Sequence, residues 1–396
     1  MQRVNLPHIR QPPWLSTRCC HRYNEWRRNA RAKYCLLAGL RDLVGQDMRN
    51  LPRLGIVFLG IMVALAGVVL LFVVNMPQKE DSHHQLQQIA KPYAFDFVSW
   101  ELHVLSYLPE EMLCKGADAN REARLCTQIR TVLADEGISA FPPITFRLEK
   151  PPHLLVMSPR EKIVYLDRRM LRQKLSVDEM ERLESQIDEL GLSSLVVELG
   201  GFGATYPPIV SDDAALTYTI NTAVEEWLHQ HLVFRPLGFL YLLDSVGIRR
   251  DPDVVTMNET LAGIVSEEIG SEVYARYYKG QEDVKTDGNS LGFDFDAEMR
   301  ETRKTVDCYL SQGKIEQAER YMEERRKEFV ANGYHIRKLN QAYFAFHGIY
   351  GQDPASVSPI YEDLKQLRAE SPSLRDFLDD VAAMRNYAEL TEALER

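Results

Sequence analysis

Apolar and polar positions divide the chain into an uncharged run, a strand-rich middle and a helical remainder. The uncharged run GIVFLGIMVALAGVVLLFVVN covers residues 55–75. At 1.5 Å per residue this segment covers the roughly 30 Å hydrocarbon core of a bilayer. Because backbone groups in lipid must be paired within the segment, the pattern predicts one transmembrane helix over 55–75.

The stretch after this predicted span mixes helical and extended patterns. We expect a polar juxtamembrane linker or helix over 76–92 and helical spacing from 93 to about 140. Ser176 and Glu179 form a capping-box pattern that opens a helix to about residue 190. Short apolar runs bounded by turn residues predict strands at 144–150, 153–158, 162–167 and 192–201.

The C-terminal half has helical periodicity. Helices are expected over 213–234 and from about 258 past 278, and two more over about 355–395. MRETRKTVDCYLSQGKIEQAERYMEERRKEF predicts an αα-hairpin that turns at Gly313, and LNQAYFAFHGIY an aromatic-rich helix. The expected fold class is therefore α+β. An N-terminal transmembrane helix is followed by a domain with a mixed small sheet at 93–290 and a helical subdomain at 291–396.

Charge is distributed unevenly between the two sides of the predicted span. Residues 1–54 carry eleven Lys and Arg against three acidic residues, a net charge of about +8. Because the whole chain carries −10, the remainder carries about −18. By the positive-inside rule the tail at 1–54 is cytoplasmic, and 76–396 is extracytoplasmic. The acidic body argues against nucleic acid as a partner, because phosphates require clustered positive charge.

Three cysteines lie beyond the predicted span. Cys114 and Cys126 are twelve residues apart, and in an oxidising compartment they can form a disulfide. The sequence leaves this pairing open. Cys308 is expected to be a buried helix residue.

The helix expected over 213–234 carries candidate metal ligands. Residues i and i+4 share a helix face, so Glu225 and His229 project together. Glu226 is turned about 100° away and can reach a water held at a metal. Zinc accepts imidazole nitrogen and carboxylate oxygen in a tetrahedral set with one position for water. The segment NETLA supplies Glu259 as a candidate third ligand.

EEWLH followed by NETLA resembles the gluzincin metallopeptidases, whose pattern is HExxH and then NExxxD. The stretches FPPITFRLEKPPHLLVMSPREKI, GGFGATYPPIV and LNQAYFAFHGIYG resemble a group of membrane-anchored bacterial proteins that carry HEW-x-H. The resemblance covers roughly residues 95–395 and implies a zinc-dependent peptidase. It implies that Glu226 is the general base, that His229 and Glu259 bind zinc, and that Asn258 braces His229.

Two positions depart from the family pattern. Glu225 stands where the first His belongs, and Gly263 stands where the family has Asp. In the family that Asp accepts a hydrogen bond from the first His, so the two changes fit together. Two carboxylates and an imidazole neutralise a divalent ion, but they shift its preference towards Mn²⁺ or Mg²⁺ and weaken it as a Lewis acid. The sequence leaves open an active hydrolase and an inactive relative that binds peptides or proteins.

Other residues are candidates for contact with substrate. Tyr343, His347 and Arg337 offer donors for a developing oxyanion, although Tyr343 with its aromatic neighbours also fits a core position. The glycine-rich stretch that contains Gly201 and Tyr206 is a candidate edge for an extended peptide. Turn glycines are the alternative interpretation of that stretch.

Further chemistries have weaker support from spacing. GFGATYPP lacks the third glycine of a dinucleotide loop and continues into two prolines. Glu226-x-x-His229 matches half of a di-iron motif, but the other ExxH beyond the span, Glu80 to His83, lies in the polar linker. A helical scaffold that acts through the hairpin at 300–330 remains a third possibility.

Overall fold

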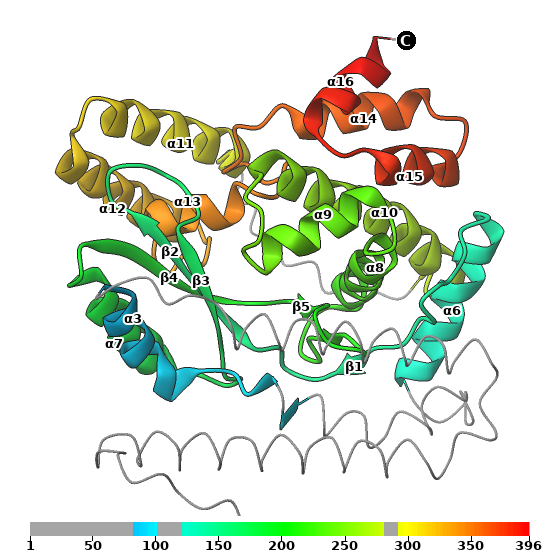
Figure 1. Ribbon diagram of the computed structural model, residues 1–396, viewed down its shortest axis with the longest axis horizontal. Coiled ribbons are helices and arrows are strands. Elements are labelled where there is room, and N and C mark those ends of the chain that lie inside the picture. Colours follow the sequence, from blue (N-terminus) through cyan, green and yellow to red (C-terminus); the bar gives the residue numbers. More distant parts are fainter. Residues whose placement is uncertain (1–81, 98, 101–120, 281–291, 396) are drawn as a thin grey trace, which may run out of the picture. The chain divides into compact units, whose positions relative to one another are not determined.

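The computed structural model describes residues 82–97, 99–100, 121–280 and 292–395 (Figure 1). The predicted basic tail at 1–54 and the predicted transmembrane helix at 55–75 lie outside the described residues. Within the described ranges, no helix combines the length and the apolar character that crossing a bilayer requires.

The described chain has the mixed α+β composition that the sequence predicts, with two small sheets and a helical C-terminal region. The N-terminal elements are α3 (Ser82–Ala90), η1 (Lys91–Tyr93), α6 (Arg121–Asp135), β1 (Arg147–Leu148), β2 (His153–Pro159), β3 (Asp167–Leu171), α7 (Val177–Asp188), β4 (Leu192–Glu198), β5 (Gly201–Phe202) and β6 (Ile209–Val210). The remaining elements are α8 (Leu216–Leu232), α9 (Pro236–Ser245), α10 (Pro252–Tyr277), α11 (Phe295–Ser311), α12 (Ile315–Ala331), α13 (Gln341–His347), α14 (Ile360–Glu370), α15 (Leu374–Ala383) and α16 (Tyr387–Leu394).

An antiparallel sheet of order β3-β2-β4 lies between two layers of helices. Successive side chains of a strand point to opposite faces. Leu155 and Met157 of β2 pack in one core cluster with residues of α3 and α7. Leu154 and Val156 pack in another cluster with residues of α13. Because helices cover both faces, every residue of β2 is buried (Figure 1).

The second sheet has the order β1-β6-β5, with β1 parallel and β5 antiparallel to β6. Its strands are two residues long each. In this order β1 and β5 are the two outer strands among the described strands, and β5 contacts α8. This contact brings the glycine-rich stretch of the sequence onto the helix that carries the candidate ligands.

Helices α8 and α10 form the centre of the largest core, which also includes residues of α6, α14 and α15. Val224 and Leu228 of α8 and Leu261 of α10 are completely buried. An added Cβ at Gly270 of α10 would overlap the side-chain oxygen of Asn221 of α8, so the two helices approach closely there. The largest core therefore fixes the two helices that carry the candidate ligands.

Two local predictions are confirmed. Ser176 accepts a hydrogen bond from the backbone of Glu179 and Glu179 returns one, which completes the capping box of α7. Helices α11 and α12 form the hairpin, and Gly313 between them has φ +70°, a left-handed conformation that favours glycine.

Several expected boundaries are wrong. The strand expected at 162–167 lies at Asp167–Leu171, because Val164 and Leu166 are exposed while Leu171 is buried. The sequence pattern did not predict α9, and α10 begins six residues earlier than expected, at Pro252. The C-terminus contains three helices where two were expected.

The cysteines differ from their expected environments. Cys308 is exposed on α11, where a buried position was expected. Cys126 is buried in α6, and Cys114 lies outside the described residues. The disulfide between Cys114 and Cys126 therefore stays a prediction.

Candidate metal site

Glu225, His229 and Glu259 converge where α8 packs on α10. Each offers one ligand atom, and these three atoms lie within 4.8 Å of one another. Nε2 of His229 is 3.5 Å from Oε2 of Glu259. The side chain of His229 is 14% exposed and that of Glu259 7% exposed, so both are largely shielded from solvent. The three ligands expected from the sequence therefore form a group that can hold a metal ion, which we call the triad.

Two neighbouring residues orient the triad. Nδ1 of His229 donates to Oδ1 of Asn258 at 2.8 Å, which leaves Nε2 to face Glu259 and a metal. The hydroxyl of Tyr241 on α9 donates to Oε1 of Glu259 at 2.6 Å. The Tyr241 ring also stacks on His229, with centroids 5.4 Å apart. The sequence pointed to Asn258 in this place but gave no signal for Tyr241.

Glu226 lies beside the triad and against the outer strand β5. An added Cβ at Gly201 would overlap Oε1 of Glu226, and one at Gly203 would approach Oε2 to 2.5 Å. Only glycine therefore allows the main chain of β5 to lie this close to the carboxylate. Gly201, expected to contact substrate, thus lies next to the residue expected to be the general base.

Burial raises the pKa of both carboxyl groups on α8. The pKa of Glu225 rises to about 7 and that of Glu226 to about 8, and the nearby His229 limits both rises. Burial opposes the charged form of His229, but Glu259, Glu226 and Glu225 together outweigh it and raise its pKa to about 10.

Glu259 differs from the other two carboxyl groups. Burial again opposes its charge, but His229 and the hydrogen bond from Tyr241 outweigh burial and lower its pKa. In the absence of a metal the triad therefore contains a charged His229–Glu259 pair beside carboxyls that hold protons near neutral pH. A divalent cation can replace these protons.

Arg337 and Tyr206, two candidates for substrate contact, are engaged by the fold itself. Nη1 of Arg337 donates to Oε2 of Glu184 at 2.9 Å, and Nη2 donates to the carbonyl oxygen of Val196, also at 2.9 Å. Tyr206 is 5% exposed, and its hydroxyl donates to the carbonyl oxygen of Pro143 at 3.0 Å. Their contacts account for both side chains without a substrate.

Tyr343 and His347 lie together at α13. Their ring centroids are 4.1 Å apart, and Nδ1 of His347 is 2.9 Å from Oδ2 of Asp353. Tyr343 packs against two of the core clusters, and burial followed by Asp353 raises its pKa. These contacts favour the core interpretation of Tyr343.

Tyr350, in the loop that follows α13, interacts electrostatically with two carboxyl groups of the triad. Burial, followed by the carboxylates of Glu259 and Glu225, raises its pKa well above its usual value. The sequence pattern pointed to Tyr343 in this stretch and gave no prediction for Tyr350. The sequence signal for a loop at this point is the pair of glycines, Gly348 and Gly351, on either side of Ile349 and Tyr350.

The same loop occupies the space beside Gly263. The backbone nitrogen of Gly351 donates to Oγ1 of Thr260 at 3.0 Å, which fixes the loop on α10. An added Cβ at Gly263 would overlap the side-chain nitrogen of Gln352. Where the gluzincin pattern has an acidic side chain, this chain therefore has a neutral amide.

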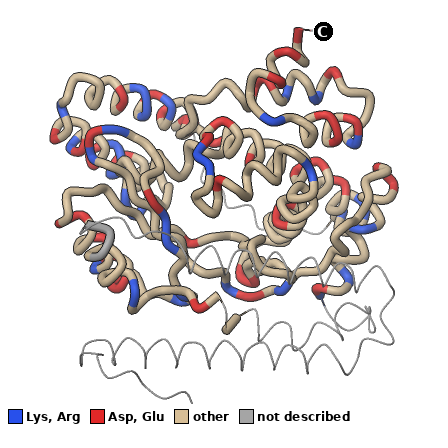
Figure 2. Tube along the Cα trace, viewed as in Figure 1, with Lys and Arg blue, Asp and Glu red and all other residues tan. Residues whose placement is uncertain are grey.

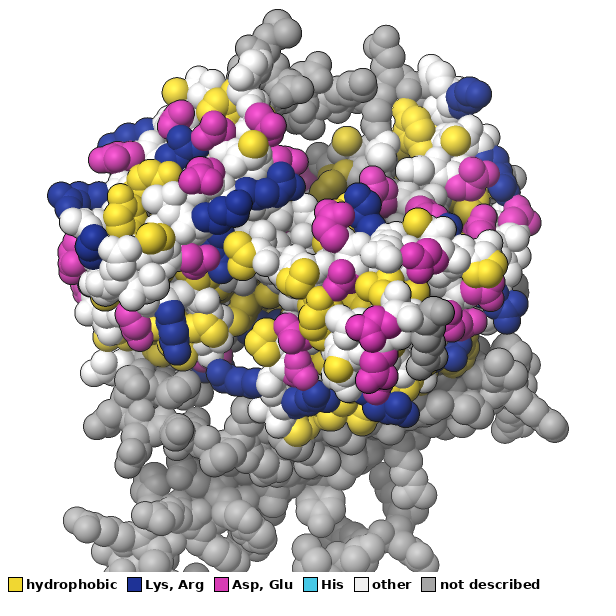
Figure 3. All heavy atoms as spheres, turned by 90° about the horizontal axis from the view of Figure 1, so that it is seen from above, with side chains coloured by type: hydrophobic (Ala, Val, Ile, Leu, Met, Phe, Trp, Pro, Cys, Tyr) yellow, Lys and Arg dark blue, Asp and Glu magenta, His cyan; other side chains and the backbone are white. Residues whose placement is uncertain are grey.

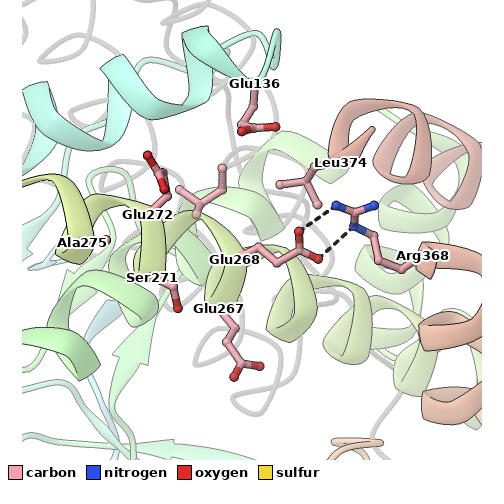
Figure 4. A pocket seen from close by; sticks show the side chains of 9 residues that line it. Glu136, Glu267, Glu268, Ser271, Glu272, Ala275, Arg368 and Leu374 are labelled. Atoms are coloured by element: carbon pink, nitrogen blue, oxygen red, sulfur yellow. Dashed lines mark hydrogen bonds and ion pairs between the residues drawn. The ribbon is translucent and has the colours of Figure 1, made fainter. Parts of the chain in front are cut away.

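A separate hollow lies further along α10 (Figure 4). Four carboxylates line it together with Arg368 of α14, one directly after α6 and three on α10: Glu136, Glu267, Glu268 and Glu272. Nε and Nη2 of Arg368 donate to Glu268 at 2.9 and 2.8 Å. The lining of this hollow includes none of the triad residues, so it is distinct from the candidate metal site.

The described surface carries mixed charge. Basic and acidic residues are interspersed along the chain trace (Figure 2). On the face seen in Figure 3, Lys and Arg side chains lie among Asp and Glu side chains and small apolar areas. This face therefore presents mixed rather than single-sign charge to a partner.

Comparison of the chain with models of protein families, with curated proteins and with solved structures gave no match. A functional assignment therefore depends on the residues and the geometry of the triad and its surroundings.

Proposed function

We propose that the protein is a metal-dependent peptidase in which Glu225, His229 and Glu259 hold a divalent cation. The observation that carries this proposal is the convergence of three donor atoms within 4.8 Å, directly beside Glu226. One imidazole and two carboxylates balance the two charges of the cation and suit zinc, with manganese as the alternative. When bound, the cation polarises a peptide carbonyl and lowers the pKa of water.

Glu226 has the role of general base. A base works best when its pKa lies near the operating pH and it lies within hydrogen-bond reach of the proton it removes. Burial gives Glu226 a pKa of about 8, and a cation in the triad would lower this value towards neutrality. Its position between the triad and β5 suits proton transfer at a peptide bond bound along that strand.

The substrate is a peptide in extended conformation that adds to β5. Among the described strands β5 is the outer strand of its sheet that contacts α8, and outer strands accept peptides through main-chain hydrogen bonds. At Gly201 and Gly203 the main chain lies directly against the Glu226 carboxylate, so a peptide that pairs with this strand would pass close to the base. We assign to Tyr350 the oxyanion-donor role first considered for Tyr343, because Tyr350 shares the electrostatic environment of Glu225 and Glu259.

The proposal places this chemistry outside the cytoplasm on a membrane-anchored protein. Its support is the uncharged run at 55–75 and the basic tail at 1–54. A single-pass anchor would restrict the substrates to peptides and proteins that reach the membrane surface.

A second candidate function is peptide or protein binding without catalysis. The observation in its favour is the His229–Glu259 pair, with Nε2 3.5 Å from Oε2 and a His229 pKa of about 10. This pair satisfies much of the triad without a cation. The replacement of the first family His by Glu225 points in the same direction.

Hydrolysis of a synthetic peptide library by the full-length chain in detergent tests the proposal. We expect cleavage that stops after chelation, returns with zinc or manganese, and falls about 10²–10⁴-fold in Glu226→Gln while the metal content is unchanged. Glu267→Gln is the matched control, since Glu267 is an exposed glutamate of α10. A chain that binds metal and cleaves no peptide would contradict the peptidase and support the binding module.

A further inference from the structure

We propose that Arg168 and Tyr165 form a carboxylate-binding subsite beside the triad, so that the protein selects peptides with a carboxylate one or two residues from the cleaved bond. This inference rests on the proposed function, which it deepens by naming the substrate class. The subsite is built from β3, the loop before it and α9, and none of its residues stood out in the sequence.

Arg168 reaches from β3 to the end of α9 that follows Tyr241. Its Nη2 donates to the carbonyl oxygen of Ser245 at 3.1 Å. Ser245 follows Tyr241 by four residues, so both lie on one face of α9, about one 5.4 Å turn apart. The hydroxyl of Tyr241 in turn donates to Glu259 at 2.6 Å. The guanidinium therefore lies at the end of the helix whose Tyr241 holds a metal ligand, and both Tyr241 and Glu259 act on it electrostatically.

The charge of Arg168 lacks a partner in the described structure. The neighbouring Arg169 pairs with Asp167 at 2.7 Å, and Arg172 pairs with Glu179 at 2.6 Å. In the described part of the chain, no carboxylate lies in ion-pair contact with Arg168. A partly buried arginine without such a partner has donors that a ligand can use.

The acidic groups that act on Arg168 are engaged elsewhere. Glu259 and Asp244 interact with Arg168 electrostatically without forming an ion pair with it. Glu259 accepts the hydrogen bond from Tyr241 and faces His229. Asp244 accepts from the backbone nitrogen of Asp251 at 2.8 Å. Neither carboxylate therefore needs the donors of Arg168.

Tyr165 adds a second unused donor. The guanidinium carbon of Arg168 is 5.9 Å from the centroid of the Tyr165 ring. The Tyr165 hydroxyl is buried, and although Arg168 can donate to its oxygen, its proton has no acceptor among the described residues. Burial raises the pKa of Tyr165 to about 12, so the hydroxyl keeps its proton and remains a donor. A buried donor without a partner points to a ligand that supplies the acceptor.

The chemistry of these donors fits a carboxylate. Arginine has five N–H donors in a planar fork that matches the two oxygens of a carboxylate, and the Ser245 bond uses one nitrogen only. An extended peptide advances about 3.3 Å per residue, so one helical turn corresponds to one or two residues. The carboxylate can belong to the C-terminus of the peptide or to an Asp or Glu side chain.

The test compares four peptide libraries of otherwise equal composition on the full-length, metal-loaded chain. The libraries combine a free or amidated C-terminus with either Asp and Glu or their amides. We expect the wild type to bind and cleave one carboxylate-bearing class at least about tenfold better than the amidated neutral library. The pair of libraries that differs identifies whether the carboxylate is terminal or on a side chain.

Variants connect this preference to Arg168. Arg168→Gln should abolish the preference, and Arg168→Lys should keep part of it because the charge and the bond to Ser245 can be retained. Arg169→Gln, a matched control in the next position, should keep the full preference. Thermal unfolding of each variant identifies those that fold.

The outcomes separate the inference from the proposed function. Cleavage without a carboxylate preference, or a preference that survives in folded Arg168→Gln, overturns the subsite and leaves the peptidase intact. A carboxylate preference in binding without any cleavage overturns the peptidase and leaves the subsite intact. Absence of binding to every library overturns the subsite.

Discussion

Asn258 decides which nitrogen of His229 is available to a metal. Its side chain is completely buried, and Oδ1 faces Nδ1 of His229 at 2.8 Å. The amide nitrogen of Asn258 has no partner among the described residues, so the bond to His229 is the contact that explains its burial. A buried polar side chain whose one hydrogen bond goes to a candidate metal ligand indicates that the orientation of the His229 ring is important to the site.

We predict that Asn258→Ala weakens zinc and manganese binding by about 10–100-fold, because His229 loses the acceptor that fixes its tautomer. Isothermal titration calorimetry on the full-length chain measures this change. Asn258→Asp keeps an acceptor for Nδ1 and should retain most of the affinity. Equal affinity of wild type and Asn258→Ala would contradict an orienting role.

The residues of the candidate site differ in how far the sequence revealed them. Glu225 and His229 could be predicted because four residues along one helix bring them to one face. Glu259 could be predicted from the resemblance of NETLA to the gluzincin pattern. Tyr241 and Arg168 could not, because α9 and β3 bring them to the triad from separate parts of the chain and neither position carries a local pattern.

The contact between α8 and β5 positions Glu226. Helix α8 supplies the carboxylate, and Gly201 of β5 and Gly203 directly after it leave the space that the carboxylate occupies. A strand of two residues adds little hydrogen-bonding energy to the sheet. Its contribution to the site is the main chain that contacts Glu226 on α8. The site therefore depends on the distance between these two elements.

We predict that Gly201→Ala displaces the Glu226 carboxylate and lowers the rate of peptide cleavage at least about tenfold, while the triad keeps its metal. Peptide cleavage and metal content, measured on one preparation, check this prediction. Gly263→Ala is the control, since its Cβ meets the mobile end of Gln352 and a helical Gly→Ala change gains up to about 1 kcal/mol. Equal losses of activity in both variants would refute the role of the strand.

Arg337 connects elements far apart in the sequence. It joins Glu184 of α7, whose side chain is 3% exposed, to the segment that leads into α13. Helices α7 and α13 cover opposite faces of the β3-β2-β4 sheet. The ion pair lies at the β4 edge and connects the two helical layers to that strand.

We predict that Arg337→Ala lowers the free energy of unfolding by about 1–3 kcal/mol, because it leaves the buried Glu184 carboxylate with only Lys338 at 3.6 Å and the backbone nitrogen of Val196 as partners. Urea unfolding measures this loss. Arg326→Ala, which removes a partly exposed pair with Glu323 on α12, should cost about 1 kcal/mol. A small loss for Arg337→Ala with impaired substrate binding would restore its original assignment to the substrate site.

Elements were predictable where one local rule dominated. The capping box predicted where α7 begins. Burial of both faces of β2 gave this strand a mostly apolar run in the sequence. Helix α9 is apolar around most of its circumference, so it lacks the amphipathic stripe by which helices are recognised. Helix α10 begins at Pro252, after the N-cap Asp251. These two residues are the local signals for its start, whereas the expected start at Asn258 came from the motif.

The whole described molecule combines a covered sheet with a helical core, and the charges buried between its elements couple folding to protonation. The folded metal-free chain holds protons on Glu225, Glu226 and His229 up to pH values of about 7, 8 and 10. The same groups in the unfolded chain lose them near pH 4.5, 4.5 and 6.5. The folded state therefore binds more protons than the unfolded state between these limits.

We predict that the stability of the metal-free chain falls as pH rises from about 5 to 9, since stability decreases with pH wherever the folded state binds more protons. A bound cation should remove most of this dependence, because it replaces the protons. Urea midpoints measured across this range with chelator or with zinc check both statements. A metal-free midpoint that rises with pH would contradict the assigned protonation.

The metal content of the full-length chain tests the central claim most directly. After equilibration with zinc or manganese and removal of free ions, we predict about one metal ion per chain in the wild type. The ion should be lost in His229→Ala and kept in His231→Ala, since His231 bonds to the carbonyl oxygen of Phe141 instead. Absence of metal from the folded wild type, together with one ion per chain in Glu225→His, would contradict the claim.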